Sequence, residues 1–539
     1  MSYSDDARSG LRAALACFAA ALAFLLITHW PFLRLPYHWD ELGQFVPAAH
    51  DLLVYGALVP RSTLPNVHPP LLMLYLAGVW KLFGFAILVT RVAMLVVAAA
   101  TIAAAHLLAR RLANARAAWT AAAFLAISPP FVAQGMLAQL DLPAALWALL
   151  AMCWFVEGRW WLCGVAATAL ALTKETGLIV PVVLGGFSAW WFVGRRRRAA
   201  AGSWRGSLAC RKVRTEAGQG AGRGPGGPPH QTLIQQVPLS RPLMPLLMPF
   251  VAVGGWLFYL HSVTGHWLGN AQFGEYNLAE PLNPVRILLV LARRLFQIGL
   301  ADFHWVATAV LILAVLRYGA LRELPWRLLG AVIGAYLIFH SIVGGAVLLR
   351  YLLPAMALFY VATAAALNSV PRRTHMPALA LFVAGLAVSN WWNPRYRFAS
   401  YEDNLAVTDF IQLQLNAATW LSEHAPERTV ISAWPLTDAL SNPLLGYVRR
   451  PLRVNPVENF QPEAWQKIDS SRLEVVALYS RSWDRPPGWQ DWPPIARLLR
   501  KHFNYKRQLP REELIQRFRL RSVARWERRG QWMEIFVIW

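Results

Sequence analysis

FAILVTRVAMLVVAAATIAAAHLLARRL, residues 85–112, is the stretch that decides the fold. Its first 24 residues, 85–108, contain a single charged side chain, Arg91, and two arginines follow at positions 110 and 111. A helix needs about 20 apolar residues to cross a bilayer, and basic residues gather at the cytoplasmic ends of such helices. Residues 85–108 therefore predict a transmembrane helix that ends in the cytoplasm.

The composition of the whole chain agrees with this stretch. Hydrophobic residues make up 56% of the 539 residues and charged residues only 15%, whereas soluble domains contain about 25% charged residues. An ordinary soluble enzyme, a disordered chain and a disulfide-stapled secreted domain are therefore excluded. The sequence predicts a polytopic α-helical membrane protein with about 11 transmembrane helices, near residues 12–33, 85–108, 117–133, 143–157, 160–173, 177–194, 243–262, 303–317, 326–343, 352–369 and 376–391.

The basic residues are distributed unevenly between the loops that join these spans. With the N-terminus placed in the cytoplasm, 21 of the 30 basic residues in 1–391 fall in cytoplasmic segments and nine fall outside. This asymmetry is typical of the positive-inside rule, so it explains much of the net charge of +23 without a nucleic-acid partner. The stretch 195–241 is rich in Gly, Pro and Arg and predicts a disordered cytoplasmic loop.

The composition changes near residue 392. Residues 1–391 carry 13 of the 29 acidic residues, and residues 392–539 carry the other 16. We therefore expect a transmembrane domain over 1–391 and a small soluble α/β domain over 392–539, on the periplasmic side because an odd number of spans precedes it. The expected helices of this second domain are 405–423, 493–503 and 511–519, and the expected strands are 428–434, 473–480 and 532–539.

Four acidic residues lie at the outer ends of predicted spans, namely Asp40, Asp141, Glu175 and Asp302. Desolvating a carboxylate at a membrane boundary is costly, so such residues are candidates for function. A solvated loop end or a helix cap explains each one alone, but their convergence on one face favours a site. Asp40 begins a long outer loop, residues 34–84, and we expect its apolar segment 71–83 to be a helix lying at the membrane surface.

Several motifs on this outer face resemble those of a known superfamily. They are Asp40-Glu41, His68-Pro69-Pro70-Leu71, Ser128-Pro129-Pro130 before Leu140-Asp141-Leu142-Pro143, Lys174-Glu175-Thr176-Gly177, and Arg350-Tyr351-Leu352-Leu353-Pro354. In this order the chain resembles the polyprenyl-phosphate-sugar-dependent glycosyltransferases of the GT-C superfamily. The similarity is to the protein O-mannosyltransferase and lipid A aminoarabinose transferase branch (glycosyltransferase family 39-like). The mannosyltransferases continue His-Pro-Pro-Leu with Gly-Lys, whereas this chain has Leu72-Met73, so the sugar and the acceptor stay open.

The resemblance implies an inverting enzyme that transfers a hexosyl or pentosyl group from a polyprenyl-phosphate donor to a protein, lipid or glycan acceptor. It implies catalytic positions at Asp40 and Glu41, with Asp40 as the general base and Glu41 as its structural partner. We expect cations to hold the donor phosphate. The expected substrate-binding residues are His68, Asp141, Lys174, Glu175, Arg293, Arg294, Arg350 and Tyr351.

Alternative interpretations stay open at this stage. Asp40 is also placed to cap the helical stretch 41–54. The apolar stretch 285–301 is expected to be a helix lying flat on the outer surface, where Arg293 and Arg294 are placed to snorkel toward lipid headgroups. The chain has no Cys/His spacing typical of a metal site, so no cofactor is certain and a divalent metal is an open alternative. The alternative function is a transporter or channel with a periplasmic accessory domain, although the paired broken segments typical of transporters are missing from the sequence. We expect a multi-pass protein of a bacterial-type inner membrane with a cytoplasmic N-terminus.

Overall fold

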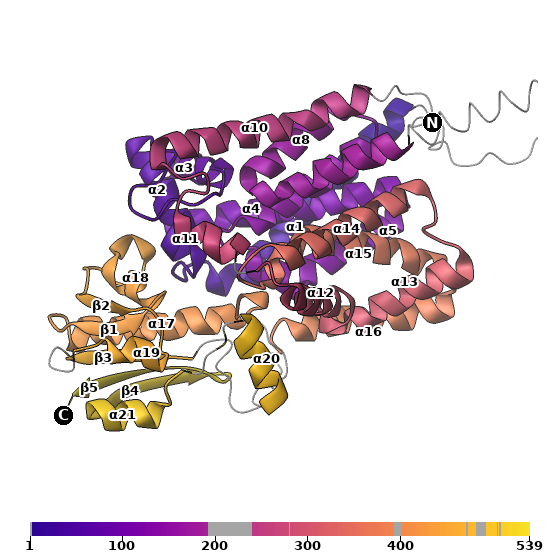
Figure 1. The fold of residues 1–539 in the computed structure, drawn as a ribbon. Coiled ribbons are helices and arrows are strands. Elements are labelled where there is room, and N and C mark those ends of the chain that lie inside the picture. The colour runs from indigo at the N-terminus through magenta and orange to yellow at the C-terminus, as the bar shows by residue number, and fades with distance from the viewer. Residues whose placement is uncertain are drawn as a thin grey trace, which may run out of the picture.

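A computed structural model describes residues 3–191, 240–279, 281–392, 401–469, 473–480, 492–503, 505 and 508–538. It shows a helical bundle joined to a small domain that contains the only sheet in these ranges (Figure 1). Within these ranges, six helices are long and apolar enough to cross a membrane, and four shorter helices are also apolar. The loop predicted at 195–241 lies outside the described residues apart from its last two positions, which begin a helix.

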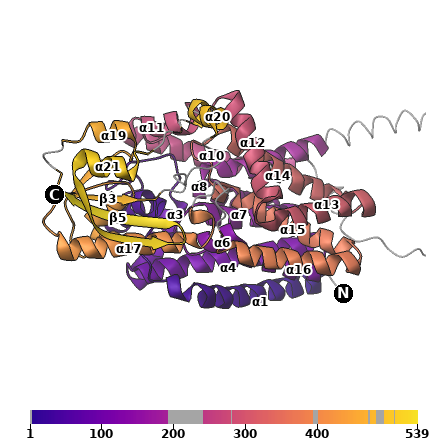
Figure 2. The same ribbon diagram turned by 90° about the horizontal axis from the view of Figure 1, so that it is seen from below.

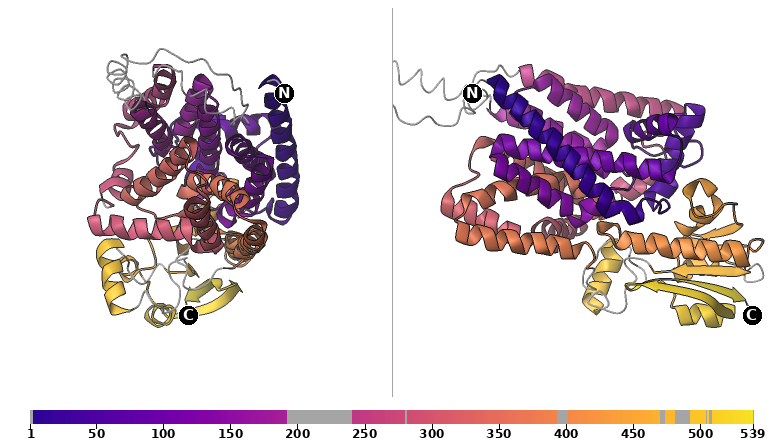
Figure 3. Two further views of the ribbon diagram at one scale, coloured as in Figure 1. Left: turned by 90° about the vertical axis from the view of Figure 1, so that its right-hand side faces the viewer. Right: turned by 180° about the vertical axis from the view of Figure 1, so that it is seen from behind.

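Each predicted transmembrane span overlaps a helix, so the polytopic helical fold is confirmed. The bundle helices are α1 (Tyr3–His29), α4 (Ile87–Leu112), α5 (Ala115–Ile127), α6 (Pro129–Gln134), α7 (Asp141–Val156), α8 (Trp160–Thr173), a helix over 179–191, α10 (Ser240–Thr264), α13 (His304–Tyr318), α14 (Leu324–Ile342), α15 (Leu353–Ser369) and α16 (Arg372–Ser389). Their long axes run in broadly the same direction (Figures 1 and 3).

The predicted span 117–133 is wrong in one respect, because it is two helices rather than one. Helix α5 ends at Ile127, and the short helix α6 begins at Pro129. Pro129 and Pro130 have no N–H groups to donate to the preceding turn, and their rings clash with it, so α5 cannot continue through them. The break leaves the Ser128 side chain buried between the two helices.

Helix α15 lies at the centre of the bundle, and nearly all of its residues are buried. Its Tyr360 hydroxyl lies 2.8 Å from Ser128 Oγ, at the break before α6, and 2.8 Å from Nε2 of His304, where α13 begins. A buried hydroxyl needs such partners, because an unsatisfied polar group in an apolar interior is costly. These contacts fix the N-terminal half of α15, and the turn Leu349–Leu352 that precedes it, relative to two other helices.

The outer loop 34–84 is largely helical. A π-helical turn (Glu41–Phe45) leads into α2 (Val46–Tyr55), and the predicted apolar segment is the helix α3 (Leu71–Phe83). Two further short elements lie on this side, α11 (Ala271–Gly274) and the amphipathic helix α12 (Pro284–Gly299). Both predicted surface helices, 71–83 and the stretch around Arg293, are therefore helical as expected.

The C-terminal domain is built on a five-stranded mixed sheet with the order β2-β1-β3-β5-β4. Strand β1 is parallel to β2 and β3, whereas β5 is antiparallel to β3 and β4. Helix α17 packs on one face of the sheet and α21 lies on the other (Figures 1 and 2). The elements are α17 (Ala406–His424), β1 (Val430–Ala433), α18 (Leu436–Ser441), β2 (Val454–Val457), α19 (Pro462–Gln466), β3 (Val475–Tyr479), α20 (Pro493–Phe503), α21 (Arg511–Phe518), β4 (Leu520–Arg528) and β5 (Gln531–Ile538).

The C-terminal domain docks on the start of the outer loop. The Tyr447 hydroxyl donates to the carbonyl of Tyr37 at 2.8 Å, and the Trp434 ring packs edge-to-face on Trp39 with ring centroids 4.7 Å apart. Trp39 has a left-handed backbone, with φ of 53°, which is unfavourable for a bulky residue and persists only where surrounding contacts enforce it. The domain contact therefore helps to set the chain direction one residue before Asp40.

Candidate active site

Asp40 lies between the first span and the π-helical turn of the outer loop. Its Oδ2 pairs with Nη2 of Arg350, and its side chain is 18% exposed. Although Asp40 directly precedes the turn Glu41–Phe45, its side chain makes no capping hydrogen bond. The geometry therefore favours an ion-paired, partly accessible carboxylate over a helix cap.

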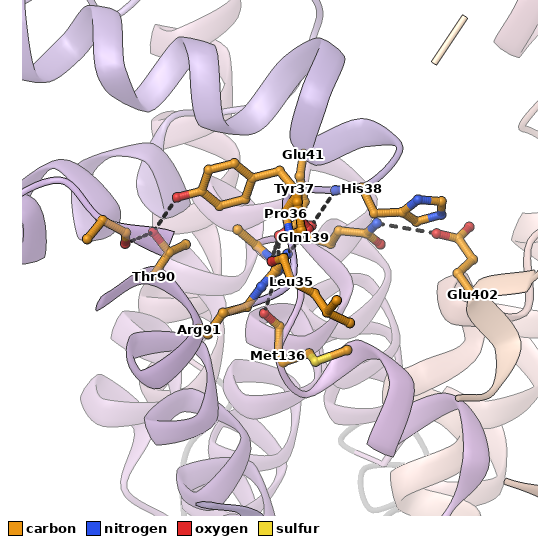
Figure 4. Close-up of polar contacts among 12 residues, drawn as sticks. Leu35, Pro36, Tyr37, His38, Glu41, Thr90, Arg91, Met136, Gln139 and Glu402 are labelled. Carbon is orange, nitrogen blue, oxygen red and sulfur yellow. Dashed lines mark hydrogen bonds and ion pairs between the residues drawn. The ribbon is translucent and has the colours of Figure 1, made fainter. Parts of the chain in front are cut away.

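Glu41 points into the protein instead. Its carboxylate accepts a hydrogen bond from Nη1 of Arg91 at 2.6 Å, and from the backbone N–H groups of Ala138 at 2.6 Å and His38 at 2.8 Å. Nη1 of Arg91 also donates to the Met136 carbonyl at 2.9 Å (Figure 4). Both side chains of the pair are fully buried. Glu41 thus joins the outer loop to the chain that leads into α7, next to Asp40 but outside its ion-pair network.

Arg350 is the centre of the site. Beside its pair with Asp40, its Nη1 donates to Glu402 Oε2 at 2.6 Å and to Gln139 Oε1 at 2.6 Å, and its Nε lies 3.1 Å from Asp141 Oδ2. Gln139 also donates to Glu402 at 3.3 Å (Figure 4). One guanidinium group therefore holds three carboxylates that come from distant parts of the chain. A planar group with five N–H donors is suited to such a role.

Lys174 extends this network at the end of α8. Its Nζ donates to Asp141 Oδ1 at 2.6 Å and lies 3.9 Å from the centroid of the Tyr351 ring. Asp141 is thus bridged between Lys174 and Arg350, and all three side chains are buried. The structure therefore brings together five of the expected residues, namely Asp40, Asp141, Lys174, Arg350 and Tyr351.

The charges of this network do not balance when every group is ionised. Asp40, Asp141 and Glu402 carry three negative charges, whereas Arg350 and Lys174 carry two positive ones. Burial raises the pKa of Glu402 to about 7, and the nearby Arg350 only partly opposes this effect. Protonation of Glu402 therefore restores neutrality near physiological pH.

His68 and Glu175 form a separate pair on the same outer face. His68 Nδ1 lies 2.9 Å from Glu175 Oε2, and the imidazole ring also packs against Phe273 and Phe45. Across the described ranges, no group of three or more His, Cys, Asp or Glu side chains is arranged to hold a metal ion. The pair is consistent with a structural or substrate-binding role for both residues.

Arg293 and Arg294 lie on α12 and have different surroundings. Arg294 is fully buried and donates through Nη1 to the Leu348 carbonyl at 2.6 Å and to Gln297 Oε1 at 3.1 Å. Its Nε and Nη2 atoms are buried without a hydrogen-bond partner among the residues that the structure describes. Arg293 is half-buried on the same helix. Arg294 therefore offers unsatisfied donors beside Leu348, which lies two residues before Arg350. Simple snorkelling to lipid would instead leave its guanidinium exposed.

Two residues of the network, Gln139 and Glu402, are missing from the sequence predictions. Glu402 belongs to the segment that follows the last predicted span, and it lies 52 positions from Arg350 along the chain. A Glu402-Asp403 pair immediately before a helix, at the domain boundary, was the available signal. The spacing of residues along the sequence does not reveal that this segment folds back beside Arg350 at the outer end of the bundle.

Replacing Glu41 by Gln tests its structural role. We expect the free energy of unfolding to fall by about 3 kcal/mol, because the variant leaves Arg91 as an uncompensated buried charge. Thermal unfolding in detergent, followed by intrinsic fluorescence, measures the change. Glu323→Gln, at an exposed position, is the control and should stay within about 0.5 kcal/mol. A Glu41→Gln protein with unchanged stability and lost turnover would instead assign Glu41 to the chemistry.

Comparisons with known proteins show what the chain is similar to. A family model described as dolichyl-phosphate-mannose-protein mannosyltransferase matches residues 67–208, which include His68, Asp141, Lys174 and Glu175. A search of curated proteins finds no match.

A search of solved structures gives several similar chains. The crystal structure of ArnT from Cupriavidus metallidurans bound to undecaprenyl phosphate superposes with a TM-score of 0.52 at 14% identity, covering 99% of this chain and 98% of that one. Oligosaccharyltransferase AglB from Archaeoglobus fulgidus gives 0.44 at 14% identity over 86% and 69% of the chains. Arabinofuranosyltransferase AftD from Mycobacteria gives 0.42 at 16% identity over 98% and 40%.

The ArnT likeness extends over essentially the whole of both chains, so it includes the C-terminal domain as well as the bundle. The family match covers residues 67–208, which leave Asp40 and Arg350 outside it. The chain is therefore a polytopic helical membrane protein with the fold of ArnT, and its residues 67–208 are similar to the family described as dolichyl-phosphate-mannose-protein mannosyltransferase.

Proposed function

We propose that this protein is a membrane glycosyltransferase that moves a sugar from a polyprenyl-phosphate donor to an acceptor hydroxyl with inversion at the anomeric carbon. The observation that carries the proposal is the pairing of Asp40 and Asp141 with one guanidinium group, Arg350. A partly exposed carboxylate beside buried cations is the combination that such a displacement requires. ArnT, the structure of similar fold, was crystallised with undecaprenyl phosphate, which supports a lipid-phosphate donor here.

In this mechanism Asp40 accepts the proton of the acceptor hydroxyl as that oxygen attacks the sugar. Asp40 is the most exposed of the three carboxylates around Arg350, since Asp141 and Glu402 have side-chain exposures of 6% and 4%. Arg350 and Asp141 keep the base in position rather than react themselves. The aromatic pair Trp39 and Trp434 limits the directions from which an acceptor reaches Asp40.

The donor phosphate gains negative charge as the sugar departs, so cations must stabilise it. Arg350 has most of its N–H groups engaged by Asp40, Asp141, Glu402 and Gln139. Arg294 has buried donors that the described residues do not satisfy. We therefore assign the phosphate chiefly to Arg294, with Lys174 as the second cation.

A transporter or channel finds no support in these observations. The charged residues of the network gather at the outer ends of α8 and α15 and in the loops beside them, instead of lining a path along the helices. We place the protein in a bacterial-type inner membrane with the N-terminus in the cytoplasm, on the basis of the Lys/Arg asymmetry.

The proposed chemistry is tested with purified protein and a panel of undecaprenyl-phosphate-linked hexoses and pentoses, by measuring the release of undecaprenyl phosphate. We expect Asp40→Asn to lower turnover by at least about 100-fold without loss of folding, because an amide is a negligible base. Glu427→Gln is the control, since it makes the same acid-to-amide change at an exposed position of the C-terminal domain. Near-full activity of Asp40→Asn would exclude Asp40 as the base.

The phosphate assignment has its own test, with undecaprenyl phosphate as the probe. Arg294→Gln should weaken binding of this lipid by about 10-fold or more, because charge-assisted hydrogen bonds contribute about 1.5–3 kcal/mol. The neighbouring Arg293→Gln should change the affinity by less than about 3-fold. Native mass spectrometry or a lipid-binding titration gives the affinities. Equal losses in the two variants would contradict a specific role for Arg294.

Ionisation of Glu402 should make the turnover rate depend on pH. Below its pKa of about 7 the side chain is neutral, so the positive charge of Arg350 acts more strongly on Asp40 and makes it a weaker base. Turnover should therefore rise as the pH increases through about 7. Glu402→Gln keeps the hydrogen-bonding shape but cannot ionise, so its rate should stay at the low-pH level and lose this step. A pH–rate profile of the variant that keeps the step would assign it to another group.

A further inference from the structure

Helix α20 is the most strongly amphipathic helix of the C-terminal domain, and the proposed chemistry does not use it. Its exposed positions include Arg497, Arg500 and Lys501, which share one side of the helix. Ile495 and Leu498 lie on the other side and are partly buried. A helix with these two faces is typical of one that lies in a membrane interface.

The orientation of α20 agrees with such a position. The helix runs across the direction of the bundle helices, and it lies at the level where α16 ends (Figures 1 and 3). Trp391 and Trp392 follow that end with 41% and 47% of their surfaces exposed, and Trp492, just before α20, is 62% exposed. Exposed tryptophans gather at the headgroup level of membrane proteins. These side chains therefore mark the level of the membrane surface.

Neighbouring contacts hold α20 at this level. It packs against the surface helix α12, where the guanidinium carbon of Arg286 lies 5.6 Å from the centroid of the Phe503 ring. Helix α12 itself exposes Leu288 and Leu295 on its outer side, at 67% and 52%. Viewed along the bundle, the C-terminal domain extends beyond the outline of the helices (Figure 3, left). In that view α20 lies outside the outline of the bundle helices, beside α12.

We propose that α20 lies flat on the bilayer surface and that Arg497, Arg500 and Lys501 bind the phosphate groups of anionic phospholipids. This contact holds the C-terminal domain, which supplies Glu402 to Arg350, at a fixed height above the membrane. The proposal does not depend on the transferred sugar or on the acceptor. Its occupant is the headgroup layer of the membrane that surrounds the bundle.

The test uses the full chain in vesicles of phosphatidylcholine alone or mixed with phosphatidylglycerol. A fluorophore on Ala496→Cys reports quenching by lipids that carry a nitroxide at the headgroup. The three described cysteines are buried, and Cys210→Ser removes the fourth. Each basic residue strengthens association with an anionic surface about 5-fold, so Arg497→Gln/Arg500→Gln/Lys501→Gln should lower the bound-to-unbound ratio of α20 by on the order of 100-fold. Raised salt should weaken the contact in the parent protein.

A matched variant controls for the loss of three charges. Lys467→Gln/Arg517→Gln/Arg521→Gln changes exposed basic residues of the same domain, of which Arg517 lies on α21, away from the bundle (Figure 1). It should leave the quenching unchanged, and Arg497→Lys/Arg500→Lys should retain it. Equal quenching in the two kinds of vesicle, or equal losses in the two triple variants, would overturn the proposal. Both outcomes are independent of glycosyltransferase activity, so they do not bear on the role of Asp40.

Discussion

The compensation of buried carboxylates by Arg350 is the constraint on which the rest of this structure depends. Asp40, Asp141 and Glu402 come from the outer loop, from α7 and from the start of the C-terminal domain, and each is ionisable in an environment of low polarity. Charges in such a place persist only when paired and hydrogen-bonded. Arg350 lies in the turn Leu349–Leu352 that leads into the central helix α15, so the packing of the bundle determines where the three carboxylates meet.

A second buried pair, Glu41 and Arg91, gives Glu41 a structural role, whereas the adjacent Asp40 has the proposed chemical role. Neighbours along the chain point in different directions, and here the Glu41 carboxylate is fully buried whereas the Asp40 carboxylate is partly exposed. Because Glu41 also accepts two backbone hydrogen bonds, it holds the turn on which Asp40 sits. The position of Asp40 therefore depends on the Glu41–Arg91 pair, which does not contact substrate in the proposed mechanism.

Most of the fold could be predicted from the sequence, because the length of an apolar stretch and the positions of the arginines beside it are local properties of the chain. The spans, the surface helices at 71–83 and around Arg293, and the strands near 430, 475 and 535 all follow from such patterns. Strand β2 was not predicted because it is only four residues long and contains Pro456. Strand β4 was not predicted because it lies at an exposed edge of the sheet and its sequence is interrupted by arginines. Asp40, Asp141, Lys174 and Arg350 were found by motif order, but Glu402 required knowledge of how the second domain returns to the first. Long-range pairing of charges has no signature in local spacing.

The span of the Arg350 cluster along the chain has a consequence for biosynthesis. Arg350 is synthesised 310 residues after Asp40, and Glu402 follows 52 residues later. The early carboxylates thus enter the membrane region before their guanidinium partner exists, and the cluster is complete only when the C-terminal domain begins to emerge. A nascent bundle therefore cannot hold Asp40 in its working position.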